Sequence, residues 1–281
     1  MSSQGISVWL TRGFEPRLLN SDSFALPNWI FPAKASSEGA ADLEYRLLDA
    51  FRRAFEGKPY LHRDSTIGDR IAQFLYEDLV QLGTSKTLVS RVASGEVALN
   101  SRNLRVGIKA RRGDGTLGER VPGTKLIHDK GFDVPRGQIA TVEIGTEVKV
   151  IAKSMIKQFD RVKRDLTGQV AEFNTGGGTP ICVGIVGINW AASYRSFEGK
   201  KHYDTTGTSK EPHPIKDAQK TGVRLEHEAK PAFDEFLILR FRATNLKPFP
   251  FEWVNESATT TAYGALLIRV SRKYEQLFGQ K

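Results

Sequence analysis

The sequence is poor in cysteine and has no long apolar run. Its single cysteine, Cys182, can form neither an internal disulfide nor a zinc cage of thiolates. No stretch of about 18 apolar residues is present, so no membrane span is expected. The first 20 residues lack the basic start and apolar core of a secretory signal. We therefore expect a protein of the reducing cytoplasm without a membrane partner.

Several familiar site patterns are also missing. The five histidines show no metal-ligand spacing. Residues 83–87 read Gly-Thr-Ser-Lys-Thr and lack the glycine spacing of a phosphate loop. There is no nucleophile elbow and no internal repeat. A Ser-His-Asp triad stays open, because its members need not be neighbours in sequence.

What the chain does have is positive charge. Its 281 residues include 41 Lys and Arg against 32 Asp and Glu, for a net charge of +9. Residues 101–125 hold seven basic and two acidic residues among several glycines. This balance favours a polyanionic partner such as nucleic acid, although ordinary solubility charge is the alternative.

Hydrophobic periodicity predicts an α/β fold with one domain, residues 1–281. We expect helices at 40–55, 66–82, 154–173 and 261–278, and short strands near 87–92, 104–109 and 235–243. For the helix at 66–82 we expect Asp64 or Ser65 as N-cap and Gly83 as the stop, and for the helix at 154–173 Ser154 as N-cap. A strictly alternating strand at 139–152, the helix at 154–173 and an apolar strand at 180–190 form a βαβ unit with a parallel strand pair. Residues 195–231 are expected to be a polar insertion with partial helix.

One strand carries acids and a lysine on a single face. Glu143, Glu147 and Lys149 share that face because side chains alternate along a strand, and the opposite face is apolar. On a central strand such a face is costly unless it lines a polar cleft. Gly145 leaves space between the two glutamates. The alternative is a solvated surface ion pair.

Asp133 lies fourteen residues before Glu147 and is followed by a turn at 135–137. A bend there can bring its carboxylate to Glu147. Two carboxylates can share a hard divalent cation, and a lysine beside them can orient water or stabilise a phosphate.

An Asp followed at a distance by Glu-x-Lys on a strand, then a helix, resembles the PD-(D/E)xK nuclease superfamily, which includes the restriction endonucleases. The resemblance covers residues 66–190, under half of the chain, and departs from the pattern at Phe132, which stands where the family has proline. It implies a restriction-endonuclease-like core, a mixed central sheet flanked by helices in the order αβββαβ. It also implies that Asp133 and Glu147 hold Mg²⁺ and that Lys149 is the catalytic lysine.

Further residues are candidates around this centre. Asp129 is an alternative to Asp133, and Glu143, Asp78 and Glu77 are candidates for an extra metal-binding acid, although a helix acid paired with an arginine is the competing interpretation for the last two. The candidate DNA-binding residues are Arg105, Lys109, Arg111, Arg112, Lys153 and Lys157.

These inferences lead to a Mg²⁺-dependent endonuclease that cuts double-stranded DNA, most like a type II restriction endonuclease. The nuclease core would span about 66–190, after an N-terminal segment at 1–60 and before a recognition and closing segment at 195–281. A palindromic site would require a homodimer. The alternatives are another nuclease of the superfamily, a repair or anti-phage enzyme acting on DNA ends or on branched or modified DNA, and a non-catalytic basic DNA-binding protein.

Overall fold

The computed structural model describes residues 44–61, 66–101, 113–153, 155–175, 178–198, 201–207 and 213–279, all within one compact unit, Ser37–Lys281. The helices are α1 (Arg46–Phe55), α2 (Thr66–Leu82), α3 (Lys86–Ala93), α4 (Met155–Phe173), α5 (Pro214–Arg224) and α6 (Glu256–Phe278), with a π turn at Leu225–Ala229 and a 3-10 turn at Lys230–Ala232. The strands are β1 (Val97–Asn100), β2 (Gly115–Glu119), β3 (Arg136–Gly137), β4 (Ile144–Ile151), β5 (Ile181–Asn189), β6 (Tyr194–Glu198), β7 (Lys201–Thr205), β8 (Glu235–Ala243) and β9 (Phe251–Trp253). Within these ranges, no helix has the length and apolar character needed to cross a membrane.

Seven strands form one mixed sheet in the order β3-β1-β2-β4-β5-β8-β9. β2 pairs antiparallel with both β1 and β4, whereas β4, β5 and β8 are parallel. The remaining two strands, β6 and β7, form a separate ribbon. The α/β class, the mixed central sheet and the parallel β4–β5 pair predicted from the sequence are confirmed.

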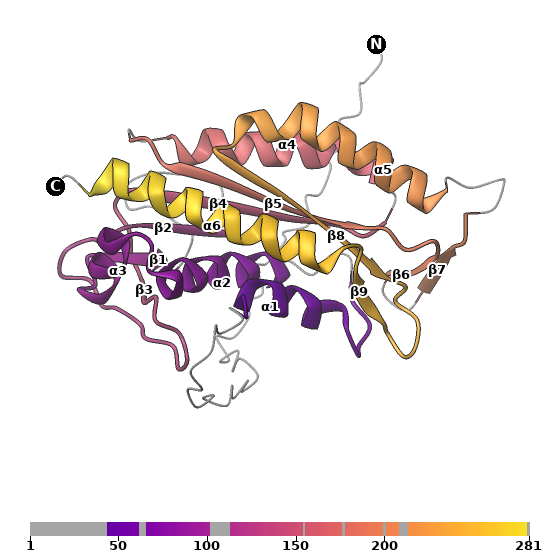
Figure 1. The fold of residues 1–281 in the computed structure, drawn as a ribbon, viewed down its shortest axis with the longest axis horizontal. Helices are drawn as coiled ribbons and strands as arrows, with labels where there is room; N and C mark the ends of the chain where they lie inside the picture. The colour runs from indigo at the N-terminus through magenta and orange to yellow at the C-terminus, as the bar shows by residue number, and fades with distance from the viewer. Residues whose placement is uncertain are drawn as a thin grey trace, which may run out of the picture. The chain divides into compact units, whose positions relative to one another are not determined.

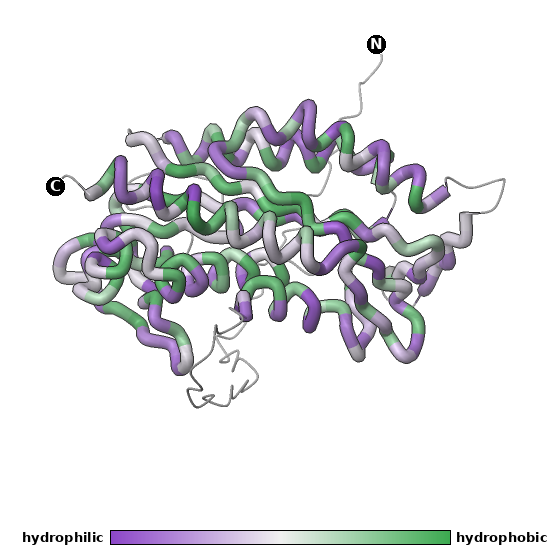
Figure 2. Tube along the Cα trace, in the orientation of Figure 1, coloured by the Kyte–Doolittle hydropathy of each residue, from purple (hydrophilic) through white to green (hydrophobic). Residues whose placement is uncertain are grey.

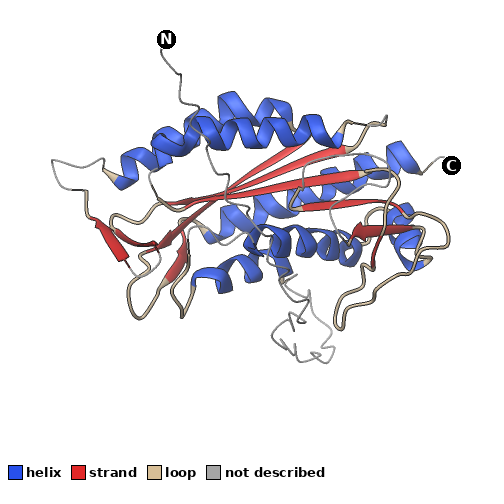
Figure 3. Cartoon of the chain, turned by 180° about the vertical axis from the view of Figure 1, so that it is seen from behind, coloured by secondary structure: helices blue, strands red, loops and turns tan. Residues whose placement is uncertain are grey.

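Helices cover both faces of this sheet (Figures 1 and 3). Alternation along β4 and β5 supplies one apolar set to each face. Ile144 and Val148 of β4 pack in the core under α1, α2, α3 and α6, while Ile151 packs with α4 and α5. Figure 2 shows the hydrophobic colour concentrated on the central strands. All nine residues of β5 are buried, as its apolar sequence predicts.

The structure differs from the predicted elements in several places. Residues 87–92, predicted as a strand, belong to helix α3, because the side chain of Ser85 caps it by accepting a hydrogen bond of 3.1 Å from the Leu88 N–H. Helix α6 begins earlier than expected, where Asn255 caps it by accepting from the Ala258 N–H. The strand expected from residue 139 begins at Ile144, and the insertion at 195–231 contains the β6–β7 ribbon as well as α5.

Some of the other predictions agree with the structure, and the rest concern residues that the structure does not describe. Helix α2 has the bounds expected for it, and Gly83 follows it with a positive φ of 66°, the conformation that suits a glycine stop. The strand predicted at 104–109 and the predicted N-caps Asp64, Ser65 and Ser154 lie outside the described residues.

Candidate active site

Asp114, directly before β2, lies beside Glu147 of the neighbouring strand β4. Asp114 immediately precedes β2, whose Gly115 is paired with Thr146 of β4. The Asp114 carboxylate accepts a hydrogen bond of 2.8 Å from the backbone N–H of Val148. The antiparallel pairing of β2 with β4 therefore fixes one carboxylate next to the other.

Two glycines allow Asp114 to pass between helices. A Cβ on Gly113 would lie 2.8 Å from the Phe173 ring of α4, and one on Gly115 would lie 2.6 Å from Ala72 of α2. Both distances are shorter than ordinary van der Waals contact. The Gly-Asp-Gly sequence thus lets the backbone run against both helix layers at the point where the carboxylate is presented.

Lys149 lies on the same face of β4 as Glu147, as the strand alternation predicts, and its ammonium donates to Glu147 Oε1. The Glu147 side chain is 5% exposed and that of Lys149 is 27% exposed. The second oxygen of Glu147, Oε2, is buried without a hydrogen-bond partner among the described residues. A buried carboxylate oxygen of this kind is costly unless a further cation or donor reaches it.

Burial and the neighbouring charges shift both groups. Burial and then the negative charge of Asp114 raise the pKa of Glu147 to about 7, against a smaller opposing effect of Lys149. Burial lowers the pKa of the Lys149 ammonium, but Glu147 and Asp114 outweigh burial and raise it overall. Lys149 is therefore held as a cation beside two carboxylates that repel each other.

A cavity of about 250 Å³ opens beside these side chains. Asp114 and Lys149 line it together with Gln158, Arg161 and Asp165 of α4. The rest of its wall is mainly apolar and is formed by Phe55, Tyr60, Leu61, Ile67, Gly68, Val148, Val150, Ala152 and Val162. Asp114 and Lys149 thus border a space that a ligand can enter, and Glu147 lies next to it as the partner of Lys149.

The donor set fits a magnesium ion only in part. Asp114 and Glu147 supply hard oxygen ligands, and the unpartnered Oε2 of Glu147 and its raised pKa both indicate that positive charge is in deficit there. Over the described ranges, no group of three or more His, Cys, Asp or Glu side chains gathers as a metal site. Mg²⁺ would therefore take water and substrate oxygens for its remaining positions, as it commonly does.

The structure does not bring Asp133 to this pair. Its backbone N–H donates to the Glu77 carboxylate at 2.9 Å, and the residue is exposed. Glu77 stands nine residues along α2 from Gly68, whose backbone lies against Asp114. Nine residues correspond to about 13.5 Å of helix, so the turn at 135–137 does not deliver Asp133 to Glu147. Asp129 is held elsewhere too, in a two-point ion pair with Arg136 at 2.5 and 2.8 Å.

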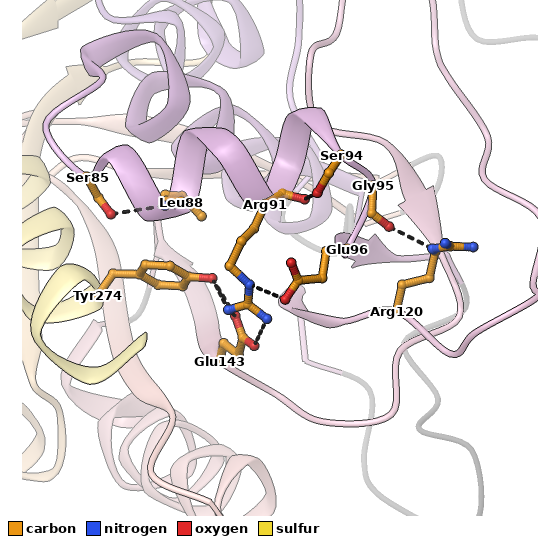
Figure 4. Close-up of polar contacts among 9 residues, drawn as sticks. All are labelled: Ser85, Leu88, Arg91, Ser94, Gly95, Glu96, Arg120, Glu143 and Tyr274. Atoms are coloured by element: carbon orange, nitrogen blue, oxygen red, sulfur yellow. Dashed lines mark hydrogen bonds and ion pairs between the residues drawn. The ribbon is translucent and has the colours of Figure 1, made fainter. Parts of the chain in front are cut away.

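Glu143 takes part in a different interaction. Both its carboxylate oxygens accept from the Arg91 guanidinium, at 2.9 and 3.0 Å, and one also accepts from the Tyr274 hydroxyl (Figure 4). The group joins α3 to α6 through the segment before β4. Gly145, expected to leave open space between the two glutamates, is covered by the Phe173 ring. The structure therefore gives Glu143 a structural partner set rather than a place beside Glu147.

The two acids of α2 are also bound to protein groups. Glu77 forms an ion pair of 2.9 Å with Arg46 and accepts from the N–H groups of Asp133 and Val134. Asp78 accepts from the first N–H groups of α1, at Arg46 and Leu47, and from the Tyr263 hydroxyl. For Glu77 this is the alternative weighed above, a helix acid paired with an arginine, and Asp78 caps a helix instead.

Four of the candidate DNA-binding residues, Arg105, Lys109, Arg111 and Arg112, lie outside the described residues. Lys153 is half-buried just after β4, and Lys157 is exposed on the first turn of α4. The sequence interpretation missed Asp114 as a site residue. The available signal for Asp114 was its position between two glycines directly before a strand.

Comparison of the chain with protein-family models, curated proteins and solved structures gives no match.

Proposed function

We propose that this protein is a Mg²⁺-dependent endodeoxyribonuclease with a restriction-endonuclease-like core, whose catalytic residues are Asp114, Glu147 and Lys149. The observation that carries the proposal is that Asp114, directly before β2, meets Glu147 and Lys149 of the neighbouring strand β4, where Asp114 and Lys149 line a cavity. Asp114 takes the role that the sequence had suggested for Asp133.

The order of elements supports the same conclusion. Helix α2, strands β1, β2 and β4, helix α4 and strand β5 follow one another as αβββαβ, apart from the short α3 and β3. The four strands are neighbours in the sheet, in the order β1-β2-β4-β5. In this arrangement Asp114 precedes the second strand and Glu147-Val-Lys149 lies on the third, as in the nuclease superfamily that the sequence resembles.

The chemistry is phosphodiester hydrolysis. Asp114 and Glu147 would hold the metal ion, which when bound supplies positive charge next to the phosphate. The Lys149 ammonium can donate to the attacking water or to a phosphate oxygen and so stabilise the charge that develops there. Water adds its oxygen to phosphorus, the bond to the leaving sugar oxygen breaks, and the water proton passes to that oxygen or to solvent.

The substrate that we favour is double-stranded DNA cut at specific sites by a homodimer, since the basic net charge suits a polyanion and a palindromic site matches a two-fold dimer. A repair or anti-phage nuclease acting on DNA ends or on branched or modified DNA is the alternative within the same chemistry. A non-catalytic DNA-binding protein would leave the unpartnered Glu147 oxygen unexplained.

The test is incubation with plasmid and phage DNAs in Mg²⁺ and in EDTA, using the wild type, Lys149→Met and the matched control Lys130→Met. Lys130 is an exposed lysine in the loop before β3. We expect discrete fragments from the wild type and from the Lys130→Met variant. We expect none with Lys149→Met or in EDTA. Full cleavage in EDTA, or full activity of Lys149→Met, would overturn the proposal.

A further inference from the structure

The cavity beside Glu147 has a second basic group, supplied by α4. Arg161 lines the cavity together with Lys149 and is solvent-exposed. In the part of the chain that the structure describes, its guanidinium contacts no acid and donates instead to Gln158 Oε1 at 2.9 Å. A cation at the mouth of a cavity that is not neutralised by protein is free to bind an anionic ligand.

Gln158 fixes this arginine to the end of β4. Its Nε2 donates to the Lys153 carbonyl at 2.8 Å while its Oε1 accepts from Arg161. Lys153 follows β4, so the amide links the strand that carries Glu147 and Lys149 to the guanidinium on α4. The long arginine side chain is thereby held in advance, which lowers the entropy lost on binding a ligand.

The acid at helical spacing from Arg161 does not neutralise it. Asp165 is four residues further along α4, a spacing that commonly gives an ion pair. Among the described residues, however, the Arg161 guanidinium donates to Gln158 and not to Asp165. Arg161 also uses one of its five N–H donors on Gln158, so the others are available.

We propose that Arg161 binds a phosphate diester of the substrate DNA at the cavity and that Gln158 is its positioning residue. The inference rests on the proposed nuclease function and adds the residue that holds the substrate backbone. A guanidinium fork matches two phosphate oxygens, and a charge-assisted pair of this kind is among the stronger hydrogen bonds in proteins. Arg161 would therefore contribute to substrate binding, and Lys149 to the chemical step.

The experiment compares Arg161→Ala, Gln158→Ala and the wild type, with Arg272→Ala as control. Arg272 is exposed on α6, which covers the opposite face of the sheet, and its loss changes the net charge equally. Binding of a short fluorescent duplex, and of one of its single strands, is measured in Ca²⁺ from about 50 to 200 mM salt. Cleavage of plasmid DNA is measured in Mg²⁺.

For Arg161→Ala we expect the affinity for the duplex to fall by about tenfold or more and KM to rise by the same factor. The change in kcat should be smaller. The slope of log affinity against log salt concentration should become less steep by about 0.9, as expected when one phosphate contact is lost. Gln158→Ala should show a smaller KM increase and leave kcat unchanged, since it removes only the positioning contact. Single-strand binding that falls as much as duplex binding would place the contact on one strand.

The outcomes separate the two proposals. A wild type that cuts DNA, with Arg161→Ala indistinguishable from Arg272→Ala, would overturn the phosphate assignment and leave the nuclease proposal standing. A wild type that neither cuts DNA nor binds it in a metal-dependent way would overturn both.

Discussion

Glu147 is the residue whose electrostatics define the site. In the folded protein its pKa is raised to about 7 by burial and by the charge of Asp114, so the fold binds a proton there more tightly than the unfolded chain does. Stability tied to this group is therefore present at low pH and is lost as the pH rises through about 7. A bound divalent cation would offset that loss, because it neutralises the same carboxylate pair.

The loss of folding stability as the pH rises through about 7 predicts that a bound metal ion stabilises the fold more at high pH than at low pH. Ca²⁺ at about ten times its Kd should stabilise the wild type by ~1.4 kcal/mol, a Tm rise of a few degrees. At one fixed Ca²⁺ concentration, the rise should be larger one pH unit above about 7 than one unit below, since the proton on Glu147 competes with the metal and weakens its binding. Scanning calorimetry of the wild type and Glu147→Gln measures it. Equal shifts at both pH values, or a full shift in Glu147→Gln, would contradict the assignment of Glu147 as a ligand.

Asp114 and Asp133 give a second, sharper comparison. Asp114→Asn should lower cleavage by more than about a hundredfold, because loss of a direct ligand should exceed the 10–100-fold cost of losing an outer partner. Asp133→Asn should keep near-wild-type activity, since the exposed Asp133 contributes its backbone N–H to Glu77. Rates of plasmid nicking measure both. If the two variants exchanged these results, the first acid would have to be reassigned to Asp133.

At the residue scale, the sequence predicted what depends on alternation and missed what depends on strand pairing. The shared face of Glu147 and Lys149 follows from the two-residue repeat of a strand. Asp114 is 33 residues from Glu147 and meets it only through the antiparallel pairing of β2 with β4. The spacing that favoured Asp133 assumed a local bend, and the backbone of that loop is bound to Glu77 instead.

At the scale of elements, the first turn of α2 lies directly against the Asp114 carboxylate. A Cβ on Gly68 would stand 2.6 Å from Asp114 Oδ1. We therefore expect Gly68→Ala to displace the carboxylate and to lower cleavage about a hundredfold, because catalysis tolerates little misplacement. Gly168→Ala is the matched control, since a Cβ there meets nothing within 4 Å, and it should keep activity and gain up to about 1 kcal/mol of helix stability. Equal activity of both variants in the plasmid assay would show that the α2 contact is irrelevant to the site.

We expect the Arg91–Glu143 ion pair to hold α3 and α6 to the sheet. Arg91→Ala leaves the buried Glu143 carboxylate without its cation and should cost about 3–5 kcal/mol of unfolding free energy. Removing both charges in Arg91→Met with Glu143→Gln should cost less than Arg91→Ala alone. The exposed pair Arg242–Glu252 is the control, where Arg242→Ala should cost under about 1 kcal/mol. Urea unfolding gives these values, and a small loss for Arg91→Ala would mean that solvent reaches Glu143 after the truncation.

Element prediction succeeded where periodicity was long and failed where it was short. Helices α2 and α4 and strands β5 and β8 extend over enough residues to show their period. The eight residues of α3 include Thr87, Val89 and Val92, whose β-branched side chains favour a strand. Tertiary packing decides there: Leu88 and Val92 are buried against the core, and the Ser85 cap starts the helix.

At the scale of the whole molecule, the fold concentrates negative charge at the site of a basic protein. Asp114 and Asp165 line the cavity with Lys149 and Arg161, and Glu147, the partner of Lys149, adds a third negative charge next to it, whereas the chain carries a net charge of +9. A divalent cation would reverse the sign of the local charge from negative to positive. Binding of DNA at this place should therefore require the metal, while long-range attraction to DNA should come from basic residues elsewhere.

The basic stretch before Asp114 is the first place to look for that attraction. Arg111 and Arg112 lie outside the described residues and precede Asp114 in the chain by three and two positions. If both arginines touch phosphates, their replacement by alanine should reduce the slope of log DNA affinity against log salt concentration by about one to two units.

The control is the double variant Lys86→Ala with Arg272→Ala, which removes the same charge from two exposed positions on α3 and α6. It should change the DNA affinity only slightly and leave that slope unchanged. Fluorescence anisotropy in Ca²⁺ from about 50 to 200 mM salt compares the two double variants. Equal slopes for both would mean that the stretch is bystander charge, and the recognition residues would then have to be sought in the β6–β7 ribbon and α5.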